Sequence, residues 1–282
     1  MQKKLIAAAV AGALVAPAAI ADGHGVAVSG SIRTGVEYTG SEWVVADNSS
    51  RLRFKASSDL GNGQSAFMNY EFRVNSAQGS IVTGNTQRLS YVGIKGDWGQ
   101  LSMGSQWSTL FNTVGTFIDP SNRFGGVGYW GNGGGQYRMK ESVYMSTQMG
   151  GLSLSGDLQM NPGGDDLDRF TVGGLMAIGG LSLGAAYQDN GDNDFTGIAG
   201  AIQLAGVGLS GGFTDVNNVG SGYGINAKLA GITVAYEDSD SYADGQIWGN
   251  YAIGLGGGAK AIIEILNDGT NTSGIGMLRM DF

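Results

Sequence analysis

The chain has 282 residues, with 24 acidic against 16 basic side chains, a net charge of -8, no cysteine, 52 glycines and only 3 prolines. The negative charge argues against a nucleic-acid partner, and the lack of cysteine excludes disulfides as a source of stability. Abundant glycine with little proline indicates many strands and tight turns rather than a disordered chain.

The N-terminal residues have the pattern of a secretory signal. Lys3-Lys4 precedes a small, apolar run over 5–19, and Ala19-Ile20-Ala21 gives an A-x-A cleavage site. A single membrane anchor is the alternative, but the apolar run is short for a spanning helix. The sequence therefore predicts a cleaved signal peptide over 1–21 and a mature chain over 22–282.

Beyond the signal, apolar and polar residues alternate with a period of two. Over 26–38 the even positions are mostly Val, Ile and Tyr, whereas the odd positions include Ser, Arg and Glu. This is the pattern of a strand with two different faces, and it recurs at 51–57, 65–74, 246–255 and 278–282. No later stretch is long enough for a membrane helix, so a membrane-spanning form would be a closed β-barrel.

The connections between the predicted strands alternate in length. We count about sixteen strands up to Phe282, with fourteen as the alternative because the pattern is weak near Ser142, Phe170 and Thr196. Short, Gly-rich turns alternate with longer polar connections, which carry most of the acidic residues. The longer connections include 40–50, 75–86, 107–137, 161–168 and 237–245. Short turns on one rim and long loops on the other are typical of outer-membrane barrels, with the long loops outside the cell.

A soluble β-sandwich or a lipocalin is the alternative to a membrane barrel, since both also alternate. Only 14% of the residues are charged, which is low for a soluble surface. The larger apolar residues also fall on one continuous face. The predicted fold class is therefore all-β: a transmembrane, antiparallel, up-and-down β-barrel.

Several segments resemble the general porins of Gram-negative bacteria. They are Ser50 to Lys55 with the turn at 59–63, the run 88–96, Trp98-Gly99 with Met103-Gly104, Arg138 with 142–144, and the terminal Phe282. Glycine richness and short loops resemble the α-proteobacterial type. The resemblance implies an outer-membrane homotrimer in contact with lipid and lipopolysaccharide. It also implies passive diffusion of small hydrophilic solutes, and a long third loop folded into the lumen.

The segment 107–137 matches that third loop and is the longest connection in the sequence. A connection of this length without strand patterning is unusual unless it is functional. Its aromatic residues suit packing inside a lumen: Phe111, Phe117, Phe124, Tyr129 and Trp130. A mobile external loop is the alternative.

The resemblance also implies a constriction between basic wall residues and the third loop. The basic residues with inward parity are Arg33, Arg51, Arg53, Lys55 and Arg88, and the loop contributes Asp119, Arg123 and Tyr129. Other residues expected to face the lumen are Glu71, Arg73, Arg138 and Glu141. The alternative is that each is simply a solvated lumen residue.

The acidic half of this pattern is weak in the sequence, because the loop offers Asp119 and little else. We therefore expect either a weaker field across the pore or a constriction that prefers anions. The acidic outer rim would instead concentrate cations at the mouth, so the sequence leaves ion selectivity open.

Nothing in the sequence predicts an enzyme. His24 is the only histidine, so no histidine-based triad or multi-histidine metal site is available. No cofactor is expected; the alternative is Ca²⁺ at Asp165, Asp166 and Asp168, whose oxygens suit that ion. The leading hypothesis is a diffusion porin. A substrate-specific porin and a plugged structural or adhesive barrel are the alternatives, and the preferred solute stays open.

Overall fold

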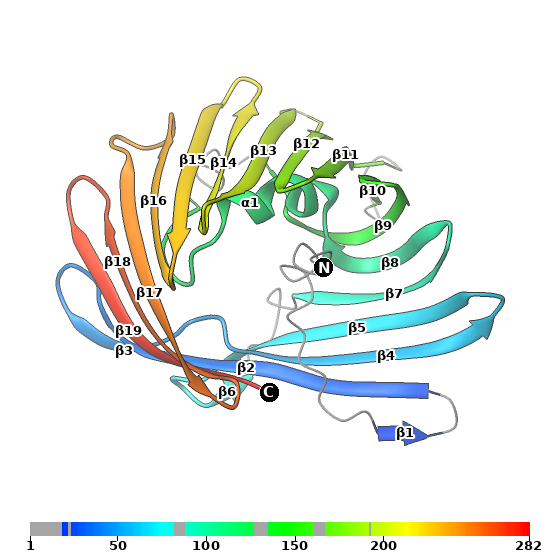
Figure 1. The fold of residues 1–282 in the computed structure, drawn as a ribbon, viewed down its shortest axis with the longest axis horizontal. Coiled ribbons are helices and arrows are strands. Elements are labelled where there is room, and N and C mark those ends of the chain that lie inside the picture. The colour runs from blue at the N-terminus through cyan, green and yellow to red at the C-terminus, as the bar shows by residue number, and fades with distance from the viewer. Residues whose placement is uncertain (1–18, 22–23, 82–87, 127–134, 161–166, 192) are drawn as a thin grey trace.

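The computed structural model describes residues 19–21, 24–81, 88–126, 135–160, 167–191 and 193–282. Within this part of the chain, 16 antiparallel strands close into a barrel, so the predicted fold and strand number are confirmed. Figure 1 shows these strands as a ring, with the short helices of one connection inside it.

Each barrel strand pairs with the next along the chain, and the last returns to the first. The strands are β2 (His24–Tyr38), β4 (Arg51–Gly61), β5 (Gln64–Asn75), β7 (Leu89–Gly96), β8 (Gly99–Trp107), β9 (Arg138–Met149), β10 (Leu152–Gln159), β11 (Arg169–Ile178), β12 (Leu181–Asp189), β13 (Phe195–Leu204), β14 (Val207–Val216), β15 (Gly220–Leu229), β16 (Ile232–Ser239), β17 (Gln246–Gly256), β18 (Ala259–Asn267) and β19 (Thr272–Asp281). The weakly patterned segments near Ser142, Phe170 and Thr196 are therefore strands of the barrel.

Three shorter strands lie outside this set. β1 (Ala19–Ala21) pairs with the start of β2, within the segment predicted to be cleaved. β3 (Trp43–Asp47) pairs with the end of β2, and β6 (Ser80–Ile81) pairs with β5. The sequence predicted plain loops at 40–50 and 75–86, which is wrong: parts of both connections extend the sheet at the rim.

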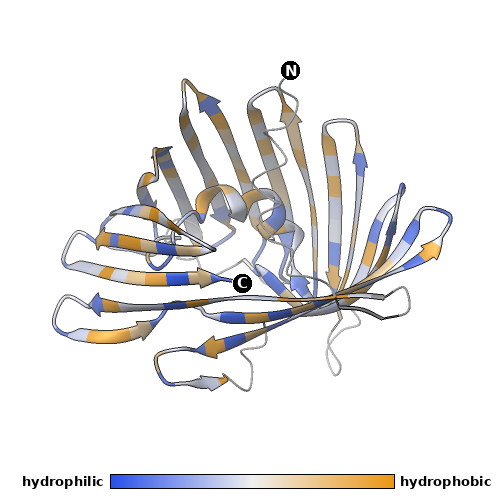
Figure 2. Ribbon diagram, turned by 60° about the horizontal axis from the view of Figure 1, so that its bottom comes forward, coloured by the Kyte–Doolittle hydropathy of each residue, from blue (hydrophilic) through white to orange (hydrophobic). Residues whose placement is uncertain are grey.

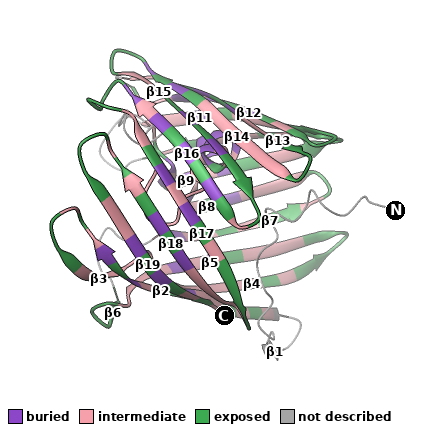
Figure 3. Ribbon diagram, turned by 60° about the vertical axis from the view of Figure 1, so that its left-hand side comes forward, coloured by how far each residue is buried: buried purple, intermediate pink, exposed green. Residues whose placement is uncertain are grey.

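The two faces of the strands differ as the alternation predicts. On β18, Ile263 and Ile265 are 57% and 53% exposed, whereas Glu264 between them is 0% exposed. Figure 2 shows hydrophobic and hydrophilic residues alternating along the strands, and Figure 3 shows the same alternation in burial on β16 to β19. The apolar side chains thus face outward, as a lipid-facing surface requires.

The barrel closes at its C-terminus. The Gly30 N–H donates to the Phe282 carbonyl at 2.8 Å, and the Phe282 N–H donates back to the Gly30 carbonyl at 3.2 Å. A side chain at position 30 would not fit, because a Cβ there would lie 2.5 Å from the Arg51 carbonyl oxygen and 2.6 Å from the Phe282 ring. Phe282 itself is 46% exposed on the apolar face, with Leu278 and Met280.

The connection between β8 and β9 runs inside the barrel. It contains η1 (Phe111–Gly115) and α1 (Thr116–Ile118), which contact β11 to β15. The buried side chains of Leu110, Val114 and Ile118 pack with Tyr137, Ala186, Phe195, Ala199 and Val216, while Phe111 and Phe117 border this cluster. The described part of this loop therefore lies inside the lumen, and the alternative of a mobile external loop is wrong.

Among the described residues, no helix is long and apolar enough to cross a membrane.

Candidate functional site: the pore constriction

Five arginines converge on one part of the inner wall. Arg33 lies on β2, Arg51 and Arg53 on β4, Arg88 immediately before β7, and Arg138 at the start of β9. On β2 and β4 their inward parity follows from the register, because Arg51 pairs with Ser31 and Arg53 with Glu71, both buried on the lumen side. We call these five residues the basic wall.

Glu71 lies in the middle of the basic wall and is 1% exposed. Its carboxylate accepts a hydrogen bond from Arg53 Nε at 2.9 Å and further charged hydrogen bonds from Arg53 Nη2 and Arg88 Nε. Arg51 Nη1 lies 4.0 Å away. One carboxylate is thus shared by three guanidinium groups, so the cluster keeps a net positive charge.

An aromatic pair joins the basic wall to the inserted loop. Trp107 and Phe111 stack with ring centroids 3.9 Å apart and planes at 17°. Arg138 Cζ lies 5.4 Å and Arg88 Cζ 5.8 Å from the Trp107 ring centroid, within cation–π range. The first residues of the loop are therefore held against the same arginines that line the pore.

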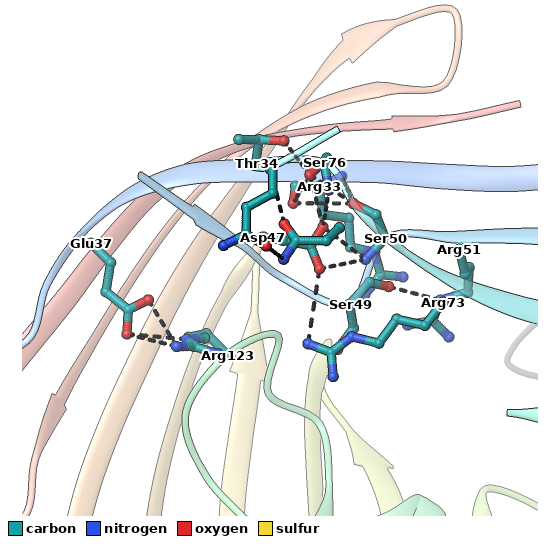
Figure 4. Close-up of polar contacts among 12 residues, drawn as sticks. Arg33, Thr34, Glu37, Asp47, Ser49, Ser50, Arg51, Arg73, Ser76 and Arg123 are labelled. Carbon is teal, nitrogen blue, oxygen red and sulfur yellow. Dashed lines mark hydrogen bonds and ion pairs between the residues drawn. The ribbon is translucent and has the colours of Figure 1, made fainter. Parts of the chain in front are cut away.

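Lys55 and Arg73 lie at the edges of this region. Lys55 faces inward on β4, further from the long loops than Arg51 and Arg53. Arg73 Nη2 lies 4.0 Å from Asp47, whose carboxylate also accepts hydrogen bonds from the Ser50 N–H and from the N–H and hydroxyl of Ser76 (Figure 4). This polar network ties β3 and the residue after β5 to the basic wall.

The acidic side of the lumen comes from the barrel wall, not from the loop. Glu37 on β2, Glu237 on β16 and Glu264 on β18 face inward and are 5%, 2% and 0% exposed. The loop offers Asp119 and little else, and the carboxylates that the wall supplies were not identified from the sequence. The sequence predicted Glu237 to begin a loop, but it is a buried residue near the end of a strand. We call these three residues the acidic wall.

Glu264 holds the backbone of the inserted loop. Its two carboxylate oxygens accept the N–H groups of Asn122, Arg123 and Phe124 at 2.9, 2.9 and 2.6 Å. Phe124 also packs beside Ile262 and two buried residues of β19. Charged hydrogen bonds from three consecutive backbone groups fix this part of the loop to β18.

The neighbouring side chains of the loop reach the rest of the acidic wall. The guanidinium group of Arg123 donates to Glu37 from Nε and Nη2 at 3.1 and 3.0 Å (Figure 4). Gly125 has a φ of +87°, and a Cβ there would lie 2.6 Å from Trp248 Nε1 and 3.1 Å from Glu237 Oε1. Glycine thus permits a close approach of the loop backbone to β16 and β17.

Asp119 follows α1 and lies on the loop. Burial, followed by the nearby carboxylates of Glu237 and Glu264, raises the pKa of Asp119 to about 6.

A second wall carboxylate anchors the beginning of the loop: Asp157, 2% exposed on β10, accepts the Thr109 N–H in a short hydrogen bond. The loop is therefore held by carboxylates at both ends of its described segment 108–126.

Some predicted site residues do not join this arrangement. Glu141 was expected to face the lumen, but it is exposed with a φ of +50°. It lies in a bulge of β9, where Gln106 pairs with Met139 and Gly104 pairs with Ser142. The extra residues of the bulge break the alternation that the prediction assumed.

Other predicted residues lie outside the described part of the chain. These are Tyr129 and Trp130 of the loop, and Asp165 and Asp166 of the suggested calcium site. The third residue of that site, Asp168, is described. In the described ranges, no group of three or more His, Cys, Asp and Glu side chains is arranged to hold a metal ion.

The chain belongs to the family of Gram-negative porins: the model of that family matches residues 7–261. Together with the closed barrel, this makes it an outer-membrane porin, that is, a channel-forming protein of the bacterial outer membrane. Family and fold point to a channel rather than to an enzyme.

Two relatives illustrate the similarity in sequence. The chain is 28% identical to the major outer membrane protein P.IB of Neisseria meningitidis over 261 residues, covering 86% of this chain and 73% of that protein. It is 27% identical to a monosaccharide porin of a Halomonas species over 222 residues, covering 68% of this chain and 60% of that protein.

Solved structures show the same fold at lower sequence identity. OmpF of Salmonella typhi, solved in complex with daunomycin, superposes with a TM-score of 0.74 at 13% identity, covering 93% of this chain and 98% of that chain. An anion-selective porin from Comamonas acidovorans superposes with a TM-score of 0.73 at 18% identity, covering 92% of this chain and 100% of that chain.

Proposed function

We propose that this porin is a passive diffusion channel for small hydrophilic solutes, with its narrowest part between the basic wall and the inserted loop. The observation that carries the proposal is the attachment of the loop across the lumen. The loop leaves β8 beside Trp107, packs on β11 to β15 and binds Glu264 on β18. A loop held along this path narrows the barrel.

We further propose that this constriction favours small anions over cations. The carboxylates of the acidic wall already have partners: Glu264 binds backbone N–H groups, Glu37 binds Arg123, and Glu237 accepts the Trp248 indole N–H at 2.7 Å. Among the described residues, the carboxylates beside the five arginines of the basic wall are Glu71 and, next to Arg33, Asp281. The charge nearest the water path is therefore positive, and such a field raises the local concentration of anions.

We propose that three copies assemble in the membrane. One of the structures that superpose on this chain is described as the trimer form of OmpT of Vibrio cholerae, with a TM-score of 0.70 at 14% identity. The outer surface here has an apolar hollow of about 490 Å³ over β2, β3, β18 and β19, where Ala261 and Gly276 lie among larger residues such as Leu278. Apolar side chains of another copy could fill such a hollow.

Conductance in planar bilayers tests the proposal. The purified protein should give stable openings that close in three equal steps, with a reversal potential in a KCl gradient that shows chloride preference. Liposomes should swell with neutral sugars up to a sharp size limit. A silent protein would contradict the diffusion channel and favour a plugged structural or adhesive barrel.

A substrate-specific porin is the second candidate. The Trp107–Phe111 stack beside Arg88 and Arg138 offers an aromatic and cationic surface at the constriction, and one relative is a monosaccharide porin. Saturable block of the current by one sugar or organic anion would favour this candidate. The calcium site at Asp165, Asp166 and Asp168 and the α-proteobacterial type stay predictions.

A further inference from the structure

Two aromatic side chains meet on the inner face of the barrel, outside the constriction. Phe67 on β5 and Tyr91 on β7 lie edge to face, with ring centroids 6.2 Å apart and planes at 79°. Both face the lumen, because Tyr91 pairs with the buried Asn69, and Phe67 lies two residues before Asn69 on the same strand. We call Phe67 and Tyr91 the lumen aromatic pair.

The lumen aromatic pair lies on the short-turn side of the basic wall. Along β5 the inward residues run from Glu71, which the arginines share, through Asn69 to Phe67. The distance along the strand from Glu71 to Phe67 is about 13 Å, at about 3.3 Å per residue. A solute that passes the basic wall from the long-loop side therefore meets these two rings next.

The barrel wall holds both rings in place. A Cβ at Gly93 would lie 2.7 Å from Phe67 Cζ, so the glycine makes room for the ring against β7. The side chain of Asn69, which is 5% exposed, forms a hydrogen bond with the Tyr91 hydroxyl. Phe67 and Tyr91 are each half-buried. Part of each ring is therefore open to the lumen.

Two lysines flank the lumen aromatic pair. Lys95 Nζ lies 5.8 Å from the ring centroid of Phe67, within cation–π range. Lys55 faces inward on β4 and pairs with Asn69, which pairs with Tyr91 on its other side. Neither lysine forms an ion pair with another described residue. Their ammonium groups are therefore available to a solute at the rings.

The carboxylates of this region already have partners or lie at its edge. Glu71 is bound by arginines of the basic wall. Asp59 Oδ1 accepts the Gly61 N–H at 2.8 Å in the turn between β4 and β5, and Asp97 is exposed in the turn after β7. The charged groups that border the rings themselves are thus the two ammonium groups, although the turns nearby are acidic.

Aromatic carbon bordered by ammonium groups suits an organic anion that carries a ring. The ring of such an anion can lie against Phe67 and Tyr91 in a stacked or edge-to-face arrangement. Its carboxylate can accept a charged hydrogen bond from a lysine. Acetate or chloride can use only the second interaction, and a neutral sugar lacks the charge.

We propose that the lumen aromatic pair, with Lys55 and Lys95, is a binding subsite for small aromatic carboxylates that pass through the pore. The proposal rests on the diffusion channel proposed above. A silent protein would contradict both, whereas a conducting pore that treats benzoate and acetate alike would contradict only the subsite. Binding has to be weak, since a solute that is held tightly would not leave the pore.

The experiment compares benzoate with acetate in planar bilayers. Chloride is replaced stepwise by one of the two anions at a constant, moderate potassium concentration, because high salt screens the lysines. With acetate, the conductance should fall in proportion to the fraction of chloride replaced. With benzoate, it should fall steeply at millimolar concentrations and then level off. A benzoate curve with the same shape as the acetate curve would overturn the proposal.

Phe67→Leu tests the contact with the ring. We expect this variant to weaken the benzoate block by about 3- to 10-fold, because the aromatic contact is lost. Phe67→Tyr keeps a ring and should retain the block within about twofold. Phe72→Leu is the matched control, since Phe72 lies on the same strand but on the outer surface. An unchanged block in Phe67→Leu would overturn the proposal.

Lys95→Gln tests the contact with the charge. We expect it to weaken the benzoate block by about threefold, because a neutral donor replaces a charged one. Lys228→Gln is the matched control: Lys228 faces inward on β15, where it pairs with the buried Thr233, and its loss removes the same charge from another part of the lumen. Equal weakening in both variants would overturn the proposal, because the block would then depend only on the total charge of the lumen.

Discussion

The basic wall and the acidic wall use their charges in different ways. In the basic wall, one buried carboxylate, Glu71, is shared among Arg51, Arg53 and Arg88, and positive charge is left over for the pore. In the acidic wall, Glu264 and Glu37 are occupied by the backbone and Arg123 of the inserted loop. In the function proposed above, one side of the lumen provides the electric field, and the other provides the attachment of the loop that sets the width of the pore.

The largest effect should come from breaking the attachment. Glu264→Gln keeps the shape of the side chain but replaces a charged acceptor of three N–H groups with an amide. We expect loop docking to weaken by about 3 kcal/mol, from the difference between charged and neutral hydrogen bonds. Single-channel recordings should then show strong open-channel noise and added conductance levels. Quiet openings like those of the exposed control Glu42→Gln would contradict the assigned attachment.

The next effect concerns the source of the field. Replacing Arg51 and Arg53 with Ser should lower the ratio of chloride to potassium permeability by about threefold, since two positive charges leave the pore. The reversal potential in a KCl gradient measures this ratio. Lys140→Ser removes a cation outside the basic wall and should leave it unchanged. No shift in the double variant would remove Arg51 and Arg53 from the constriction.

Glu71 tests the balance within the basic wall. Glu71→Gln removes the shared carboxylate, so the chloride preference should rise by about twofold. The guanidinium groups should also become more mobile and the current noisier. If chloride preference falls instead, Glu71 is not the residue that partly neutralises the basic wall.

The smallest effect should be a pH dependence from Asp119. Because the pKa of Asp119 is raised to about 6, the loop carries its negative charge at pH 7.5 and loses most of it by pH 5. Chloride preference should therefore increase modestly, by about 1.3-fold, as the pH falls through 6. The variant Asp119→Asn should show the low-pH selectivity at both pH values. A wild-type reversal potential that does not vary between pH 7.5 and 5 would contradict this assignment.

Strand parity was the part of the site that could be read from the sequence. The alternation over 26–38 and 51–57 places Arg33, Arg51 and Arg53 on the lumen side, as the register of β2 and β4 shows. The length of the connection at 107–137 also indicated a functional loop, and the resemblance to porins implied that it folds into the lumen. Both are local properties, because the period of two and the length of a loop depend only on neighbouring residues.

The attachment of the loop could not be read in this way. Glu264 has inward parity between two isoleucines, which would have placed it in the lumen. However, no local pattern shows that residues 122–124 reach it from about 140 positions away. The height at which distant strands meet depends on the register around the whole barrel. The bulge at Glu141 shows a limit of the parity argument itself. The extra residues of the bulge shift the alternation of inward and outward side chains, so the side predicted for Glu141 does not hold.

The pairing of Phe282 with Gly30 has a consequence for biosynthesis. This pairing extends the seam that β19 forms with β2 from Gly274 to Asp281, so a barrel without β19 would keep an open edge. An unpaired strand edge is unstable in lipid and prone to pair with other chains. Closure of the barrel therefore has to wait until β19 has been translated and can pair with β2.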